Sequence, residues 1–179
     1  MSKNVVIISS SPRINGNSDT LAREFARGVE DGDNKASVIE IKDIGMEFCK
    51  GCLYCQSHER CIIDDGINKI LDTVQNADVL VFATPVYYYC VSGQLKTFLD
   101  RLNPLYVREN TFKDVYLIAT CADDDISAFD GTRKCVQGWI DCFEGVKLAG
   151  SVLCGNVTDV GDVRNTDAPK KAYELGRKI

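Results

Sequence analysis

Residues 4–18 read NVVIISSSPRINGNS, and this stretch decides the fold. Its first half, Val5 to Ile8, is an uninterrupted apolar run, which indicates a short strand buried on both faces. Its second half is a loop rich in hydroxyl and amide side chains that leads into a helix. Hydroxyls, backbone N–H groups and a helix N-terminus together suit a phosphate group, because they offer many donors and a favourable dipole.

The rest of the chain alternates between strand patterns and helix patterns. Further strands are predicted at residues 36–41, 79–83, 115–120 and 147–154. Amphipathic helices are predicted around Leu21–Val29, Ile67–Val74, Leu95–Leu102, Val136–Phe143 and Ala168–Arg177. Because proline cannot donate to a central ladder, we expect the third strand to end at Thr84–Pro85 and the chain to turn there.

This alternation predicts a parallel sheet with helices on both faces. Five strand–helix units in a chain of 179 residues suit an α/β, flavodoxin-like, doubly wound five-stranded sheet of strand order 2-1-3-4-5. We expect one domain over residues 1–179, with a cysteine-rich insertion at about residues 43–66. In such a sheet the loops after the first and third strands meet at the switch point, where ligands bind.

Composition narrows the function class. The chain is 45% hydrophobic with a net charge of −5, which favours a packed core and argues against a nucleic-acid partner. The first apolar run is too short for a signal peptide, and no later run approaches the roughly 20 residues of a membrane span. We therefore expect a soluble cytoplasmic protein with no membrane partner.

Two common nucleotide motifs are missing from the phosphate-loop candidate. A P-loop needs a lysine that this loop lacks, and no two of the 14 glycines stand two positions apart, as Gly-x-Gly-x-x-Gly requires. A single phosphate held largely by side chains remains, or else an ordinary polar turn. The candidates are Ser11, Arg13, Asn17 and Ser18, with Ser9 and Ser10 secondary.

Two segments carry a resemblance to a known family. Residues 11–21, SPRINGNSDTL, resemble the phosphate loop of the NAD(P)H-dependent FMN reductase-like, multimeric-flavodoxin family. Residues 84–101, TPVYYYCVSGQLKTFLDR, resemble its isoalloxazine loop and the following helix. The resemblance covers residues 4–153. It implies an FMN-dependent oxidoreductase that passes electrons from NAD(P)H to a small acceptor such as a quinone or flavin, and a homodimer or homotetramer.

The resemblance also implies which residues bind FMN, while the flavin itself carries the hydride chemistry and no side chain is expected to be catalytic. The expected cofactor-binding residues are Ser9, Ser10, Ser11, Arg13, Asn17, Ser18, Thr84, Pro85, Val86, Tyr87, Tyr88, Thr120, Cys121 and Ala122. Tyr88 and Tyr89 would line the substrate face, or else pack at an interface.

One segment departs from the family pattern. The turn after the fourth strand lacks the glycine that the family often has and carries Asp123, Asp124 and Asp125 instead. Three carboxylates there would repel an anionic nucleotide phosphate, which argues against efficient use of NADPH, or would simply cap the next helix.

Four of the nine cysteines form a separate motif. Cys49, Cys52, Cys55 and Cys61 have the spacing C-x2-C-x2-C-x5-C. This tight spacing suits an iron–sulfur cubane better than the widely separated knuckles of zinc sites. It resembles the iron–sulfur flavoprotein branch of the same family, which implies a [4Fe–4S] cluster that exchanges single electrons with FMN and a ferredoxin-like partner.

Two other interpretations of the cysteine motif stay open. The thiols are free and shape a pocket, or they bind zinc as a sensor. His58, the only histidine, lies between the last two cysteines and is expected to be an exposed loop residue. Most of the remaining five cysteines are interpreted as packing residues.

Overall fold

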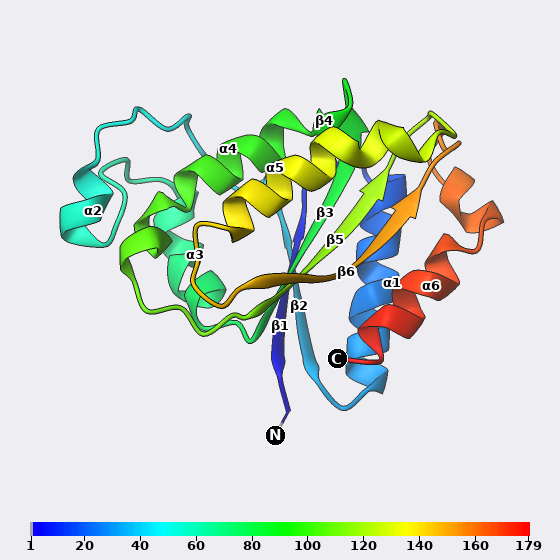
Figure 1. Cartoon of the computed structure of the whole chain (residues 1–179), viewed down its shortest axis with the longest axis horizontal. Helices are drawn as coiled ribbons and strands as arrows, with labels where there is room; N and C mark the ends of the chain where they lie inside the picture. The colour runs from blue at the N-terminus through cyan, green and yellow to red at the C-terminus, as the bar shows by residue number, and fades with distance from the viewer. Residues whose placement is uncertain (1) are drawn as a thin grey trace.

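Five parallel strands form the centre of the molecule (Figure 1). The computed structural model describes residues 2–179. The long strands are β1 (Asn4–Ser9), β2 (Lys35–Glu40), β3 (Val79–Tyr87), β5 (Asp114–Thr120) and β6 (Lys147–Cys154). They lie in the order β2-β1-β3-β5-β6, and the two-residue strand β4 (Cys90–Val91) pairs antiparallel with the end of β3. This order confirms the predicted doubly wound, flavodoxin-like sheet.

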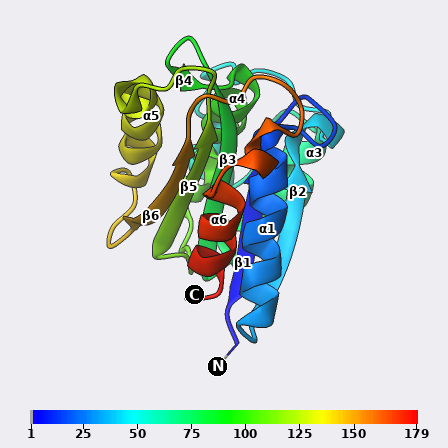
Figure 2. The same ribbon diagram turned by 90° about the vertical axis from the view of Figure 1, so that its right-hand side faces the viewer.

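Helices cover both faces of the sheet. The longer helices are α1 (Asn17–Asp31), α3 (Gly66–Gln75), α4 (Gly93–Arg101), α5 (Asp130–Ile140) and α6 (Ala168–Gly176). Helices α3, α4 and α5 lie on one face of the sheet, and α1 and α6 lie on the other (Figures 1 and 2). Their apolar side chains form one core cluster on each face. The alternation of apolar and polar residues along each helix produces this arrangement, because each helix buries one stripe against the sheet.

The third strand does not end where the sequence predicts. β3 continues through Pro85 to Tyr87 and then turns back into β4, so the expected turn at Thr84–Pro85 is wrong. Pairing of β3 with β1 stops at Ala83, while pairing with β5 continues to Pro85. The missing N–H of Pro85 therefore costs no ladder bond to β1, because β1 has already ended. The hairpin adds a sixth strand to the five expected.

The cysteine-rich segment lies beside the sheet. It contains the short helix α2 (Tyr54–His58), at the left of Figure 1, and it is held to α4 by a buried ion pair. The Arg101 guanidinium donates to Asp65 Oδ2 at 2.7 Å and to Asp65 Oδ1 at 2.9 Å. Burial alone would raise the pKa of the Asp65 carboxyl, but bonds from Arg101, Glu47 N and Ile67 N lower it below its usual value.

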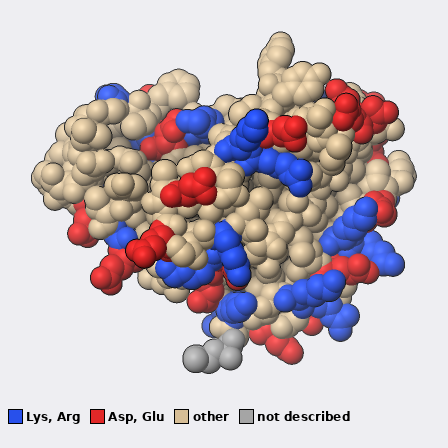
Figure 3. All heavy atoms as spheres, viewed as in Figure 1, with Lys and Arg blue, Asp and Glu red and all other residues tan. Residues whose placement is uncertain are grey.

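The surface gives no sign of a membrane span or of a continuous basic face in the view of Figure 3. There, Lys and Arg side chains are interspersed with Asp and Glu. Within residues 2–179, none of the helices combines the length and the apolar character needed to cross a bilayer.

Helices α1 and α6 lie side by side at unusually close range (Figure 2). A Cβ added at Gly28 would lie 2.1 Å from Tyr173 O, and one added at Gly176 would lie 2.2 Å from Phe25 O. Both neighbours are backbone atoms, which cannot rotate away. The absence of a side chain at these two glycines therefore sets the distance between the helices.

We expect Gly28→Ala to destabilise the protein by about 1–3 kcal/mol, because the new methyl group overpacks a rigid contact. Urea unfolding measures the change. Gly138→Ala is the matched control: Gly138 lies exposed in α5 with no described atom within 4 Å of the added Cβ. This substitution should stabilise by about 0.5–1 kcal/mol through helix propensity. Equal effects of the two substitutions would contradict the close-packing explanation.

Candidate functional site

A cavity of about 190 Å³ opens at the carboxyl ends of β1, β3 and β5. This is the switch point of the sheet, because the connection after β1 crosses one face and the connection after β3 crosses the other. Its lining comes from four segments that are far apart in sequence: Ser11, Arg13, Gly16, Asn17 and Ser18; Pro85, Val86 and Tyr87; Thr120, Cys121 and Ala122; and Val157 and Thr158.

The first wall is the loop that joins β1 to α1. Ser11 Oγ donates to Arg13 O at 3.0 Å, and Gly16 N donates to the same carbonyl at 3.2 Å, so the loop is a tight turn. A Cβ at Gly16 would come within 2.2 Å of Ser11 Oγ. Helix α1 begins directly after Gly16, and no side chain within residues 2–179 caps its first turn. Its backbone N–H groups are therefore available to an anion.

The Ser18 hydroxyl is a buried polar group in this wall. The residue is 1% exposed, and its Oγ finds no hydrogen-bond partner in the described part of the chain. A buried hydroxyl without a hydrogen-bond partner lowers the stability of the folded state by about 1–3 kcal/mol, unless a ligand or a water molecule forms a hydrogen bond with it. Its position at the cavity, beside the uncapped end of α1, fits the phosphate of FMN.

The loop after β6 closes the cavity, and its contacts are made by two of the expected phosphate-binding residues. Arg13 Nη1 donates to Thr158 O at 2.7 Å. Asn17 Nδ2 donates to Asp159 O at 2.9 Å, and its Oδ1 accepts from Gly161 N at 3.1 Å. Sequence reasoning missed this loop because residues 155–167 carry no periodic pattern or motif. Only the tertiary contacts with Arg13 and Asn17 identify it.

The second wall is the extended end of β3, where Pro85, Val86 and Tyr87 line the cavity. The following residues, Tyr88 and Tyr89, adopt left-handed φ angles of 48° and 60°. This conformation is costly for large side chains. Tyr88 is fully exposed and does not line this cavity.

Three of the expected cofactor-binding residues have their side chains engaged beneath the cavity. Ser9 Oγ donates to Asp19 Oδ1 at 2.9 Å, and Ser10 Oγ donates to Ala83 O at 3.0 Å. Thr84 Oγ1 donates to Pro85 O at 2.8 Å. All three are buried and none lines the cavity, so their side chains shape its floor.

The third wall follows β5. Cys121 is buried, and burial raises the pKa of its thiol, so the thiol stays uncharged at neutral pH. Of the three aspartates that follow, Asp125 accepts from Ser127 N at 2.9 Å and caps a short 3-10 turn (Ile126–Phe129) rather than α5. In Figure 3, acidic side chains gather at the edge above the end of β5.

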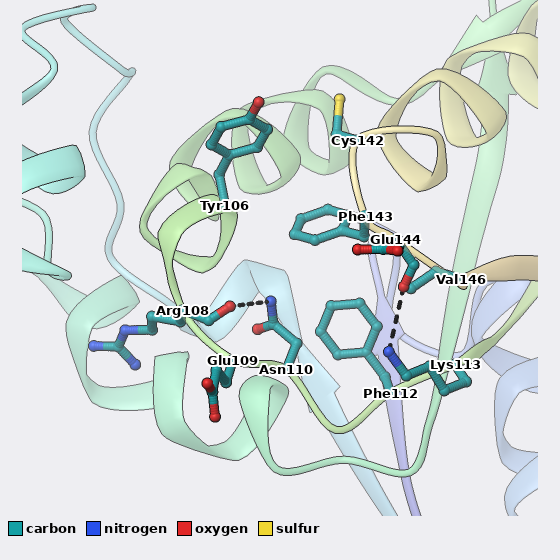
Figure 4. A pocket seen from close by; sticks show the side chains of 10 residues that line it. All are labelled: Tyr106, Arg108, Glu109, Asn110, Phe112, Lys113, Cys142, Phe143, Glu144 and Val146. Carbon is teal, nitrogen blue, oxygen red and sulfur yellow. Dashed lines mark hydrogen bonds between the residues drawn. The ribbon is translucent and has the colours of Figure 1, made fainter.

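A wider hollow of about 490 Å³ lies at the opposite end of the sheet (Figure 4). Phe112 and Lys113 precede β5, and Glu144 and Val146 precede β6, so this hollow borders the amino ends of the strands. None of the residues predicted to bind a cofactor or a metal lines this hollow. Ligands of doubly wound sheets bind at the carboxyl ends, so the smaller cavity is the stronger candidate.

The four clustered cysteines line a second, small cavity together with Arg101 and Asn103. Cys49 and Cys52 are exposed, Cys55 is buried and Cys61 is half-buried. In residues 2–179, no three Cys, His, Asp or Glu side chains converge on one metal-ion position. A cubane has four separate iron corners, each taking one thiolate, so its ligands need not converge in that way. The four thiols on this cavity are the donor type that an iron–sulfur cluster requires.

His58 does not join the cysteines. It is exposed, its ring stacks on Tyr54 with the centroids 3.8 Å apart, and its Nδ1 lies 3.0 Å from Tyr54 O. These contacts complete helix α2 and agree with the expectation of an exposed residue.

Two iron–sulfur flavoproteins are similar to this chain in sequence. An iron–sulfur flavoprotein of Methanocaldococcus jannaschii is 35% identical over 103 residues, which cover 58% of this chain but only 53% of that protein. An iron–sulfur flavoprotein of Archaeoglobus fulgidus is 26% identical over 178 residues, covering 96% of this chain and 76% of that protein.

A solved structure shares the fold over nearly the whole chain. The NAD(P)H:quinone oxidoreductase from Methanothermobacter marburgensis superposes with a TM-score of 0.79 at 15% identity, covering 99% of this chain and 96% of that one. The family model described as NADPH-dependent FMN reductase matches residues 3–128, which include the walls after β1 and β3. Because the match spans well over half of the sequence, the chain belongs to the NADPH-dependent FMN reductase family.

Proposed function

We propose that this protein is an FMN-dependent oxidoreductase that takes electrons from NAD(P)H and passes them to a small acceptor such as a quinone or a flavin. The observation that carries the proposal is the unpaired Ser18 hydroxyl at the uncapped start of α1, inside a cavity at the switch point. Family membership supports it, and so does the structural similarity to a protein named as an NAD(P)H:quinone oxidoreductase.

The cavity residues divide into two groups by what they would hold. Ser18 and the first N–H groups of α1 would bind the phosphate. Arg13 keeps donors free, because among the described residues only its Nη1 is engaged, with Thr158 O. The backbone of Val86 and Tyr87 would contact the ring edge. FMN, when bound, supplies the hydride chemistry, so this chain needs to orient it and exclude water.

We expect Ser18→Ala to raise the Kd for FMN roughly 10- to 100-fold, since a hydrogen bond to a charged group contributes about 1.5–3 kcal/mol. The apoprotein should not lose stability, because the substitution removes a buried hydroxyl that has no partner. Titration of apoprotein with FMN, followed by flavin fluorescence, measures the change.

Thr132→Val is the matched control for Ser18→Ala. Thr132 Oγ1 is a second buried hydroxyl without a partner in the described residues, but it lies in α5 and does not line the cavity. Its removal should leave the Kd for FMN within about twofold of the original. An unchanged Kd in Ser18→Ala would show that the loop does not hold the phosphate.

Anaerobic addition of NADH or NADPH to the FMN-loaded protein should bleach the flavin absorbance near the visible maximum. Asp123, Asp124 and Asp125 should make NADPH the slower reductant, because their carboxylates repel its additional phosphate. A stopped-flow comparison of the two nucleotides measures this preference. If neither nucleotide bleaches the flavin, the proposed electron donor is wrong.

A second candidate function is supported by the cysteine cavity. Four cysteines line one cavity of this chain. The similar proteins of M. jannaschii and A. fulgidus are named iron–sulfur flavoproteins. The chain would then act as an electron carrier between ferredoxin-like donors and acceptors, through FMN and a [4Fe–4S] cluster.

Homodimers or homotetramers are proposed for either function, and the exposed Tyr88 and Tyr89 suit an interface.

Anaerobically purified protein should contain about four irons per chain if the second function holds, one for each cysteine-bound corner of the cubane. Cys55→Ser should lower the iron content while FMN binding is retained, because the two cavities share no lining residue. Metal analysis and flavin quantitation on the same sample give both readings. A lack of iron, with all four cysteines titrating as free thiols, would exclude this function.

A further inference from the structure

Arg101 is a buried cation at the wall of the cysteine cavity. It is the last residue of α4, and its side chain is 0% exposed. A charge so deeply buried requires compensation, which Asp65 supplies through two hydrogen bonds. Those two bonds satisfy the ion pair, but they do not use all the donors of the guanidinium.

The remaining donors of Arg101 reach the cysteine segment. Nη1 also donates to Glu47 O at 2.5 Å, and Nη2 donates to Cys61 Sγ at 3.3 Å. Nε is buried and has no partner among the described residues. A purely structural ion pair would not need a bond to sulfur, whereas a buried guanidinium beside a thiolate would be electrostatically favourable.

Other N–H groups are directed at the same set of sulfurs. Asn103 Nδ2 donates to Cys55 Sγ at 2.9 Å, and Gly51 N donates to Cys49 Sγ at 3.4 Å. Three of the four sulfurs therefore accept a hydrogen bond. A neutral thiol is a weak acceptor, so this arrangement suits sulfurs that carry negative charge.

The charge of the expected occupant explains why such donors would be placed there. Four thiolates on a [4Fe–4S] core of charge +2 give a net charge of −2, and one-electron reduction gives −3. N–H donors directed at the sulfurs stabilise the more negative state more strongly. Charge and hydrogen bonds to the sulfurs are among the properties that set the reduction potential of such clusters.

We propose that Arg101 and Asn103 are positioning residues that hold the sulfurs of Cys61 and Cys55 and raise the reduction potential of an iron–sulfur cluster bound to them. This inference rests on the second candidate function. It assigns a role to residues of α4 and of the 3-10 turn that follows (Asn103–Val107), outside the cysteine motif itself. Reduction of such a cluster consumes one electron, which dithionite can supply.

The test compares three variants purified without oxygen. Asn103→Leu removes the donor to Cys55 and keeps the shape, and it leaves the Arg101–Asp65 pair intact. Arg101→Lys keeps the positive charge but replaces the planar guanidinium group, whose terminal nitrogens contact Asp65 and Cys61 at the same time. Arg108→Gln is the matched control, because Arg108 Nε also tethers this segment, through Glu59 O at 2.8 Å, without contacting a sulfur.

A dithionite titration followed by cluster absorbance and electron paramagnetic resonance gives the midpoint potential of each variant. We expect Asn103→Leu and Arg101→Lys each to lower the ratio of reduced to oxidised cluster, measured at a fixed potential, at least tenfold. For a one-electron couple, a tenfold change corresponds to a midpoint potential that is about 59 mV more negative. Arg108→Gln should retain the original potential, and the iron content of all variants is measured in parallel.

An unchanged potential in Asn103→Leu with full iron content would overturn the proposal, and so would an equal shift in Arg108→Gln. If Arg101→Lys fails to fold, Asn103→Leu decides the question alone. Absence of iron from the unaltered protein would also overturn it, together with the second candidate function. The flavin content of the same sample reports separately on the proposed FMN site.

Discussion

The position of β1 between β2 and β3 is the constraint on which the candidate site depends. Helix α1 follows β1 across one face of the sheet, whereas α4 follows β3 across the other. The loops after β1 and β3 therefore diverge, and a cavity remains where neither helix covers the strand ends. A hydroxyl-rich loop and the start of α1 lie at that point, so the topology brings hydrogen-bond donors together at the ends of these strands.

The cysteine cavity shares no lining residue with the first cavity, and the buried ion pair of Arg101 and Asp65 links it to the core. Asp65 also accepts from Ile67 N at the start of α3, and Arg101 ends α4. One ion pair therefore fixes the cysteine segment to two helices of the same layer. A segment with so little regular structure needs such an anchor, because short loops bury few apolar residues of their own.

The hairpin after β3 shows how context overrides a local rule. Proline normally breaks a central ladder, yet Pro85 pairs opposite Thr120 because the strand on its other side has already ended. Two tyrosines then occupy left-handed positions in which glycine or asparagine is usual. The turn rules applied to the sequence do not predict such a hairpin, because its backbone conformation is costly for side chains as large as tyrosine.

The sequence by itself determined the strand–helix alternation, the sheet order, the walls after β1 and β3, and the spacing of the four cysteines. The alternation, the loop chemistry and the cysteine spacing are local, since apolar periodicity and turn chemistry act over a few neighbouring residues. The sheet order was inferred from the alternation, because parallel strands joined by helices adopt few arrangements. Tertiary structure alone decided the rest: the closing loop at Val157 and Thr158, the engagement of Arg13 and Asn17 with that loop, and the donors of Arg101 and Asn103 on the cysteine sulfurs. Each of these hydrogen bonds joins residues at least 40 positions apart, which only the packing of helices on the sheet brings together.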